Sequence, residues 1–110
     1  MIEMNLQHRP FEMIKKGMKT IEMRLYDEKR KQIKIDDIIC FTNDKTKDLI
    51  HAKVTNLFVF DSFETLYKNF TKQEIGYLND EAANPSDMEL YYPKEKQKQY
   101  GVLAIQIKLI

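Results

Sequence analysis

Apolar and polar residues alternate over much of the chain, a pattern that predicts strands rather than long helices. Ile2, Met4 and Leu6 would share one face of a first strand. The run from Lys19 to Tyr26 alternates most regularly, with Ile21, Met23 and Leu25 on one side and Thr20, Glu22, Arg24 and Tyr26 on the other. Further strands are predicted over residues 38–42, 49–60 and 102–110.

Three short helices are predicted between these strands. The first covers residues 10–16, with Pro10 in its first turn and Gly17 just after its end. A second, over residues 63–68, would be capped by Asp61 or Ser62, and a third covers residues 94–99. Residues 27–32 and 69–93 are expected to be irregular, apart from one helical turn after Ser86. Strands outnumber helices without a strict strand–helix alternation, so we expect a mixed α+β fold, mainly β: a small barrel with short peripheral helices.

Length and composition favour a globular protein and exclude several other classes. The 110 residues suit a single domain, residues 1–110, and the six Tyr and six Phe argue against disorder. No apolar run approaches the roughly 18 residues that cross a bilayer, and Glu3, Gln7 and Arg9 interrupt any signal-peptide core, so no membrane association is expected. The single cysteine, Cys40, fits a reducing compartment and predicts a cytoplasmic protein.

The net charge of +1 is not that of a strongly basic nucleic-acid binder, but the charges are unevenly distributed. Residues 15–34 contain three acidic residues and eight basic ones, namely Lys15, Lys16, Lys19, Arg24, Lys29, Arg30, Lys31 and Lys34. One interpretation is a positive face on a nearly neutral protein; the other is an ordinary solubilising surface. The small net charge favours a small ligand over a long nucleic acid.

Most common catalytic and metal-binding patterns are absent. His8, Cys40 and His51 lack the spacing of zinc ligands, so no metal site is predicted and no cofactor is expected. The chain has no glycine-rich phosphate loop, and Ser62 and Ser86 lie outside any nucleophile motif. Cys40 lies within an apolar run, where a thiol is normally buried and unreactive.

The segment from Gly17 to Arg24 carries the strongest chemical signal. A glycine turn leads into a strand whose polar face displays Glu22 and Arg24, and a bend after Gly17 could bring Lys19 to the same side. Arg24 can grip a phosphate or a carbonyl with its planar guanidinium. Lys19 can act as a point charge, or as a base or nucleophile if burial beside Arg24 removes its proton. Glu22 can hold either cation or accept a hydrogen bond from a ligand. Ordinary ion pairs on an exposed strand face are the structural alternative.

Gly17-x-Lys19-x-x-Glu22-x-Arg24 resembles the Gly-x-Lys-x-x-Glu-x-Arg signature of the ASCH domain, a family grouped with the PUA-like barrels. The resemblance extends to segments 10–16, 24–41 and 100–105, and so covers nearly the whole chain. It implies a β-barrel of about five or six strands with helices at its rim. It also implies a cleft lined by the signature side chains, for RNA or nucleotide binding.

The resemblance also raises the possibility of catalysis. One bacterial branch of the family hydrolyses the amide of N4-acetylcytidine with a lysine, a threonine and a later glutamate, and other members are linked to ribonuclease activity. Lys19 matches that lysine, whereas Glu22 stands where the threonine would be. Glu74, Glu81 and Glu89 are the candidates for the later glutamate.

Two main hypotheses follow from these observations. The first is a small cytoplasmic domain that binds RNA, a nucleotide or a nucleoside through Lys19, Glu22, Arg24 and Arg30, with tyrosines stacked on bases. The candidate tyrosines are Tyr26, Tyr67, Tyr91 and Tyr92. The second is a hydrolase, either an amidohydrolase or a ribonuclease, in which Lys19 and Glu22 handle the proton. A domain that binds another protein is a third hypothesis.

Overall fold

The computed structural model describes residues 1–110 and contains five strands, three α-helices and two short 3₁₀ helices. In chain order the elements are β1 (Ile2–Leu6), α1 (His8–Lys15), β2 (Ile21–Leu25), the 3₁₀ helix Arg30–Gln32, β3 (Ile38–Asn43), β4 (Leu49–Phe60), α2 (Phe63–Asn69), the 3₁₀ helix Pro85–Leu90, α3 (Lys94–Tyr100) and β5 (Val102–Leu109). Every predicted strand and helix is therefore present.

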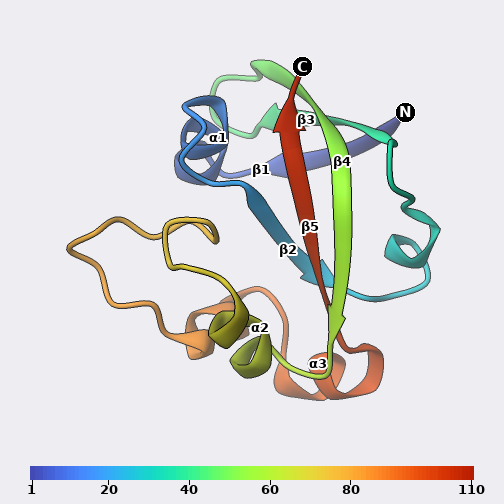
Figure 1. Cartoon of the computed structure of the whole chain (residues 1–110), viewed down its shortest axis with the longest axis vertical. Helices are drawn as coiled ribbons and strands as arrows, with labels where there is room; N and C mark the ends of the chain where they lie inside the picture. The colour runs from blue at the N-terminus through green and yellow to red at the C-terminus, as the bar shows by residue number, and fades with distance from the viewer.

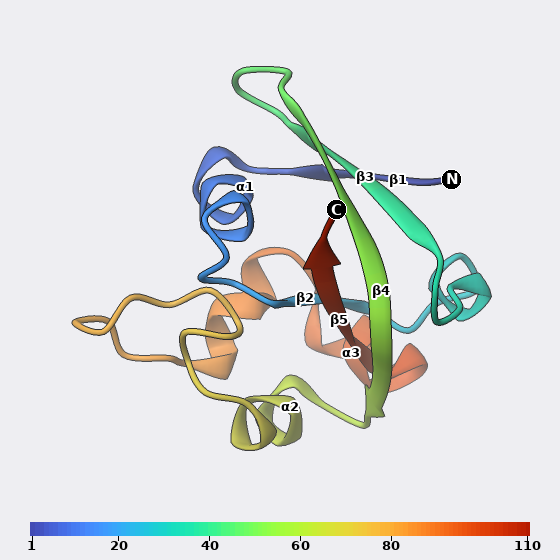
Figure 2. The ribbon, with the colours of Figure 1, turned by 45° about the horizontal axis from the view of Figure 1, so that its top comes forward.

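All five strands belong to one sheet with the order β1-β3-β4-β5-β2. β1 runs parallel to β3, and each of the other neighbouring pairs is antiparallel. Figure 1 shows β4 and β5 as a long ribbon with α2 and α3 at one end. The sheet curls so that β1 and β2, its two edge strands, lie on either side of an open seam (Figure 2). This curled half-barrel with short helices at its periphery confirms the predicted fold.

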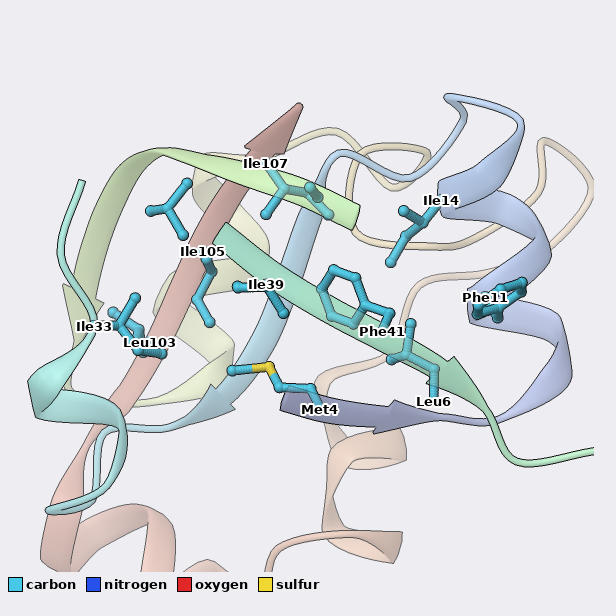
Figure 3. Close-up of a cluster of buried hydrophobic side chains, with 12 residues drawn as sticks. Met4, Leu6, Phe11, Ile14, Ile33, Ile39, Phe41, Leu103, Ile105 and Ile107 are labelled. Atoms are coloured by element: carbon cyan, nitrogen blue, oxygen red, sulfur yellow. The ribbon is translucent and has the colours of Figure 1, made fainter. Parts of the chain in front are cut away.

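The concave face of the sheet holds a core of twelve buried hydrophobic residues. Met4 and Leu6 of β1, Phe41 of β3 and Ile105 of β5 point into it, and Phe11 joins them from α1 (Figure 3). Burying a side chain of this size contributes about 1.5–3 kcal/mol, so the core fixes the position of α1 relative to the sheet.

A second core lies on the opposite face of β2 and β5. Residues paired across antiparallel strands share a face, and Met23 pairs with Ala104 in this core. Phe63 and Leu66 of α2 cover this face, together with Ile75 and with Met88 of the second 3₁₀ helix. β2 is therefore buried on both faces. Its polar residues Glu22 and Arg24 pair with Ile105 and Leu103 and so lie on the concave side.

Helix α1 begins at His8, two residues before the predicted start at Pro10. The backbone N–H of Phe11 donates to the carbonyl of Gln7 at 3.1 Å and closes the first turn. Pro10 fits within that turn because the first N–H groups of a helix have no acceptor inside it.

Two further local features sharpen the prediction. The segment 27–32, predicted as a loop, contains a 3₁₀ turn in which the Arg30 N–H donates to Asp27 Oδ1 at 3.1 Å. At α2, Ser62 provides the cap, because its hydroxyl oxygen accepts the Thr65 N–H at 3.2 Å.

None of the helices combines the length and the hydrophobicity needed to cross a membrane.

Candidate functional site

A cleft of about 530 Å³ lies at the seam of the sheet, between the edges of β1 and β2; we call it the seam cleft. Asn5, at the end of β1, and Arg24, near the end of β2, face each other there, and Arg24 Nη2 donates to the Asn5 carbonyl at 3.0 Å. One side chain thus spans the seam that no strand pairing closes.

Lys19, Glu22 and Arg24 form one ion-pair cluster in the seam cleft. Lys19 Nζ lies 2.9 Å from Glu22 Oε1, and Arg24 Nη2 lies 2.7 Å from Glu22 Oε2. Arg24 Nε also donates to Oε2, at 2.9 Å. The three side chains are 8%, 5% and 14% exposed, respectively. Ion pairs on an exposed strand face, the structural alternative, are therefore not what this strand displays.

The backbone before β2 brings Lys19 to this cluster. Gly17 ends α1 with a left-handed φ of 77°, which a glycine adopts without strain. The N–H groups of Met18 and Lys19 both donate to the Met13 carbonyl, at 2.9 and 3.1 Å, and so turn the chain back on the helix. Gly76 then lies so close that a Cβ there would be 3.1 Å from Lys19 Cδ. The glycine leaves the space that the lysine side chain occupies.

The cluster keeps Glu22 ionised. Burial alone would raise the pKa of the Glu22 carboxyl, but the Lys19 ammonium and the Arg24 guanidinium outweigh burial and lower this pKa below its ordinary value. Burial alone would lower the pKa of the Arg24 guanidinium, but the Glu22 carboxylate outweighs burial and raises this pKa above its ordinary value. One buried carboxylate thus lies between two cationic side chains, so the cluster itself carries one positive charge in excess. Arg9, Asp44 and Asp87 also line the cleft.

Four of the six tyrosines line the seam cleft as well: Tyr67, Tyr77, Tyr91 and Tyr92. The hydroxyls of Tyr67 and Tyr77 are 2.8 Å apart, and the Tyr77 hydroxyl donates to Asp87 Oδ2 at 2.8 Å. Burial and these two hydrogen bonds raise the pKa of Tyr77, which therefore stays protonated. This part of the cleft is neutral and aromatic, apart from Asp87.

Tyr91 and Tyr92 differ in how firmly they are held. Tyr92 stacks on Phe63 of α2, with ring centroids 6.1 Å apart and planes 16° apart. Tyr91 is 55% exposed, and its hydroxyl donates to Gln7 Oε1 at 3.2 Å. Tyr91 therefore offers a free aromatic face at the edge of the cleft.

The structure does not bring all five predicted ligand-binding residues together. Lys19, Glu22 and Arg24 meet in the seam cleft, whereas Tyr26 and Arg30 lie outside it. Tyr26 packs against the concave core, with Lys31 Nζ 5.5 Å from the centre of its ring. Arg30 Nη1 is 2.8 Å from Asp27 Oδ2, and Arg30 lines a separate cleft.

None of the three candidate late glutamates lines the seam cleft. Glu74 Oε1 accepts the N–H and the hydroxyl of Thr71, at 2.8 and 3.0 Å, within its own turn. Glu81 pairs with Arg9, and Glu89 lies 3.7 Å from Lys94. The acidic side chain from this part of the chain that lines the cleft is Asp87.

Tyr77, Asp87 and Arg9 line the cleft although the sequence pattern did not single them out. Tyr77 and Asp87 lie in segments without the periodicity of a strand or a helix, and Arg9 lies in the first turn of α1, just before the predicted start of that helix. The available signal was composition, because a tyrosine directly after Gly76 in a polar segment needs a neighbouring surface against which to pack.

The histidines and the cysteine do not form a metal centre. Cys40 and His51 are paired across β3 and β4, and Cys40 is buried as a free thiol. His8 Nδ1 lies 3.0 Å from Asn43 Nδ2, so this ring nitrogen has a hydrogen-bond partner within the protein. No group of three or more His, Cys, Asp or Glu side chains is arranged to hold a metal ion.

Comparisons with known proteins agree with this geometry. The sequence model of the ASCH domain matches residues 4–110. The crystal structure of hypothetical protein PH0355 has a TM-score of 0.82 and is 37% identical, covering 98% of this chain and 97% of that one. The solution structure of protein PF0455 from Pyrococcus furiosus has a TM-score of 0.77 and is 34% identical, covering 99% and 96%. A comparison with curated proteins finds no match.

The family match spans nearly the whole chain, and both similar structures share the curled five-stranded sheet at more than 30% identity. The ion-pair cluster is built from the Lys, Glu and Arg of the octet that begins at Gly17. The chain belongs to the ASCH domain family, and its fold is a small PUA-like barrel.

Proposed function

We propose that residues 1–110 act as one domain that binds single-stranded RNA or a nucleotide in the seam cleft. The observation that carries this proposal is that Arg24 lines the same cleft as four tyrosines. Nucleotides combine a phosphate with a flat base, and proteins bind them with guanidinium groups and aromatic rings. ASCH domains are PUA-like and are often linked to RNA binding.

In this proposal Arg24 and Lys19 attract the phosphate. Arg24 donates Nε to Glu22 and Nη2 to the Asn5 carbonyl, so its guanidinium is held in the cleft before a ligand binds. Glu22 fixes the direction of both cations, which reduces the conformational entropy that they would lose on binding. The volume of about 530 Å³ lies in the range that proteins use for small ligands.

The tyrosines supply the site for the base. Tyr91 is exposed enough to stack on an incoming ring, and Tyr92 is held against Phe63. The Asp87 carboxylate, which already accepts the Tyr77 hydroxyl, adds an acceptor that can read the edge of the base. The buried free thiol of Cys40 suits a reducing compartment, and we place the protein in the cytoplasm.

Binding without hydrolysis is better supported than the hydrolase alternative. A general acid needs a proton to give, and the lowered pKa of Glu22 keeps it ionised at neutral pH. Lys19 Nζ is held by that carboxylate at 2.9 Å, so an attack on a substrate would first have to break this contact. No late glutamate lines the cleft to replace either group.

A titration with short single-stranded RNAs at two salt concentrations tests the proposal. Arg24→Ala should weaken binding by about 1.5–3 kcal/mol, because it removes a charge-assisted hydrogen bond. Lys96→Ala is the matched control, since Lys96 is exposed on α3 and does not line the cleft. Wild-type binding should weaken as salt rises. An affinity unchanged by Arg24→Ala in a folded variant would contradict the proposal.

A further inference from the structure

A second cleft, of about 700 Å³, adjoins the seam cleft; we call it the N-terminal cleft. Asn5 and Arg24, which are joined by the hydrogen bond from Arg24 Nη2 to the Asn5 carbonyl, line both clefts. Lys29 and Arg30 line only the N-terminal cleft. These four basic or polar residues thus come from β1, from β2 and from the segment that follows β2.

We propose that the two clefts form one path for single-stranded RNA, in which the N-terminal cleft binds a backbone phosphate next to the nucleotide in the seam cleft. The inference rests on the proposed function and narrows its ligand to an oligonucleotide. A ligand that fills both clefts must carry groups on both sides of Arg24. A phosphodiester has a nucleoside on each side, whereas a mononucleotide ends at its phosphate.

Arg30 is the first reason to place a phosphate in the N-terminal cleft. Asp27 Oδ2 holds Arg30 Nη1 at 2.8 Å, and the side chain is 19% exposed, so the guanidinium is fixed before any ligand binds. Its Nε is buried and has no hydrogen-bond partner. That Nε is covered by protein atoms, so a phosphate in the cleft would bind the part of the Arg30 side chain that stays exposed.

Lys29 and the acidic residues determine how strong this site can be. Lys29 is exposed and has no salt-bridge partner, so its charge is available to a ligand. Glu3 and Asp37 also line the cleft, against the three basic side chains. The Asp37 carboxylate accepts a hydrogen bond from the Lys34 N–H at 2.8 Å, and this hydrogen bond reduces the repulsion between the carboxylate and a phosphate. Arg24 and Arg30 are paired with Glu22 and Asp27, and Lys29 remains as a cation without a salt bridge. This charge suits one phosphate rather than a long polyanion, in keeping with the net charge of +1.

The experiment compares three ligands by calorimetric titration: uridine 5′-monophosphate, the trinucleotide UUU, and the same trinucleotide with neutral methylphosphonate linkages. The wild-type protein should bind UUU at least tenfold more tightly than the monophosphate or the neutral trinucleotide. Arg30→Gln should weaken UUU binding about tenfold and Lys29→Ala about threefold, with the affinity for the monophosphate unchanged in both. Lys34→Ala is the matched control, because it removes one positive charge from the same segment outside both clefts.

The outcomes separate this inference from the proposed function. Equal wild-type affinity for the monophosphate and UUU, with both dependent on Arg24, would overturn the two-cleft path and keep the seam cleft as a nucleotide site. An equal loss of UUU binding in Lys34→Ala and Lys29→Ala would also overturn it, since general charge would then explain the effect. Failure of all three ligands to bind would overturn the proposed function itself. Lys29→Ala guards against misfolding in Arg30→Gln, because Lys29 forms no structural contact with Asp27.

Discussion

Lys19 and Glu22 form a salt bridge of 2.9 Å although both side chains are less than one-tenth exposed. Glu22 is paired with Ile105 in the sheet, so this salt bridge borders the hydrophobic core on the concave face. In such a place the loss of one partner leaves the other charge buried and uncompensated. The site and the stability of the fold are therefore linked through Glu22.

Acid should weaken the fold through Glu22. The folded protein holds the pKa of this carboxyl below its ordinary value of 4.5, so the ionised form stabilises the folded state above about pH 4.5. That contribution is lost as the pH falls through the lowered folded-state pKa. Glu22→Gln should lower the free energy of unfolding by about 3–5 kcal/mol at pH 7, and the difference from wild type should shrink in acid.

Urea unfolding between pH 7 and pH 3 measures this difference. Glu28→Gln is the control, since Glu28 is 84% exposed in its pair with Lys31 and should change stability little at any pH. A Glu22→Gln deficit that stays constant across the range would show that ionisation of Glu22 does not stabilise the fold.

Gly76 should be required for the position of Lys19. Gly76→Ala introduces a Cβ 3.1 Å from Lys19 Cδ at a φ of +107°, whereas Gly17→Ala, at a φ of +77°, meets no atom within 4 Å. Both substitutions strain the backbone by about 1–2 kcal/mol. Only Gly76→Ala should also weaken RNA binding, because its Cβ shifts the Lys19 side chain by a few tenths of an ångström and so disturbs its contact with Glu22. If Gly76→Ala and Gly17→Ala have similar stability and lose RNA binding equally, the proposed role of Gly76 in placing Lys19 is wrong.

Tyr91 should contribute to affinity and hardly to stability. An exposed ring that stacks on a base is worth about 1–3 kcal/mol, so Tyr91→Ala should weaken RNA binding by that amount. The neighbouring Leu90 is 85% exposed and does not line the seam cleft, so Leu90→Ala should bind as wild type does. Fluorescence anisotropy with a labelled RNA, together with thermal unfolding of each variant, separates the two effects.

No turnover is expected on N4-acetylcytidine or on unstructured RNA at neutral pH. The ionised Glu22 has no proton to give, and its two cations occupy both of its oxygens. Chromatography of the reaction mixtures would detect cytidine or RNA fragments. Product formation that disappears in Lys19→Ala and persists in Lys31→Ala would replace the binding proposal with the hydrolase.

The sequence alone determined the strands, the short helices and the ion-pair cluster. Alternation from Ile21 to Leu25 defines the two faces of β2, because successive side chains point to opposite sides of a strand. Lys19, Glu22 and Arg24 are close in sequence, so one strand and one turn bring them near one another, and the distant Gly76 leaves the space for Lys19. The same local signals placed every strand, although α1 begins two residues before its predicted start.

Tertiary structure alone decided what surrounds that cluster. Alternation cannot show that α2 and Met88 cover the second face of β2 and bury Met23, because that cover comes from residues about forty or more positions away. The alternation also cannot show that Tyr77 and Asp87 reach the cleft while Tyr26 packs against the core. A segment without periodicity does not indicate which of its side chains point inward. The seam at which Arg24 meets Asn5 exists only because the sheet curls until its two edge strands approach.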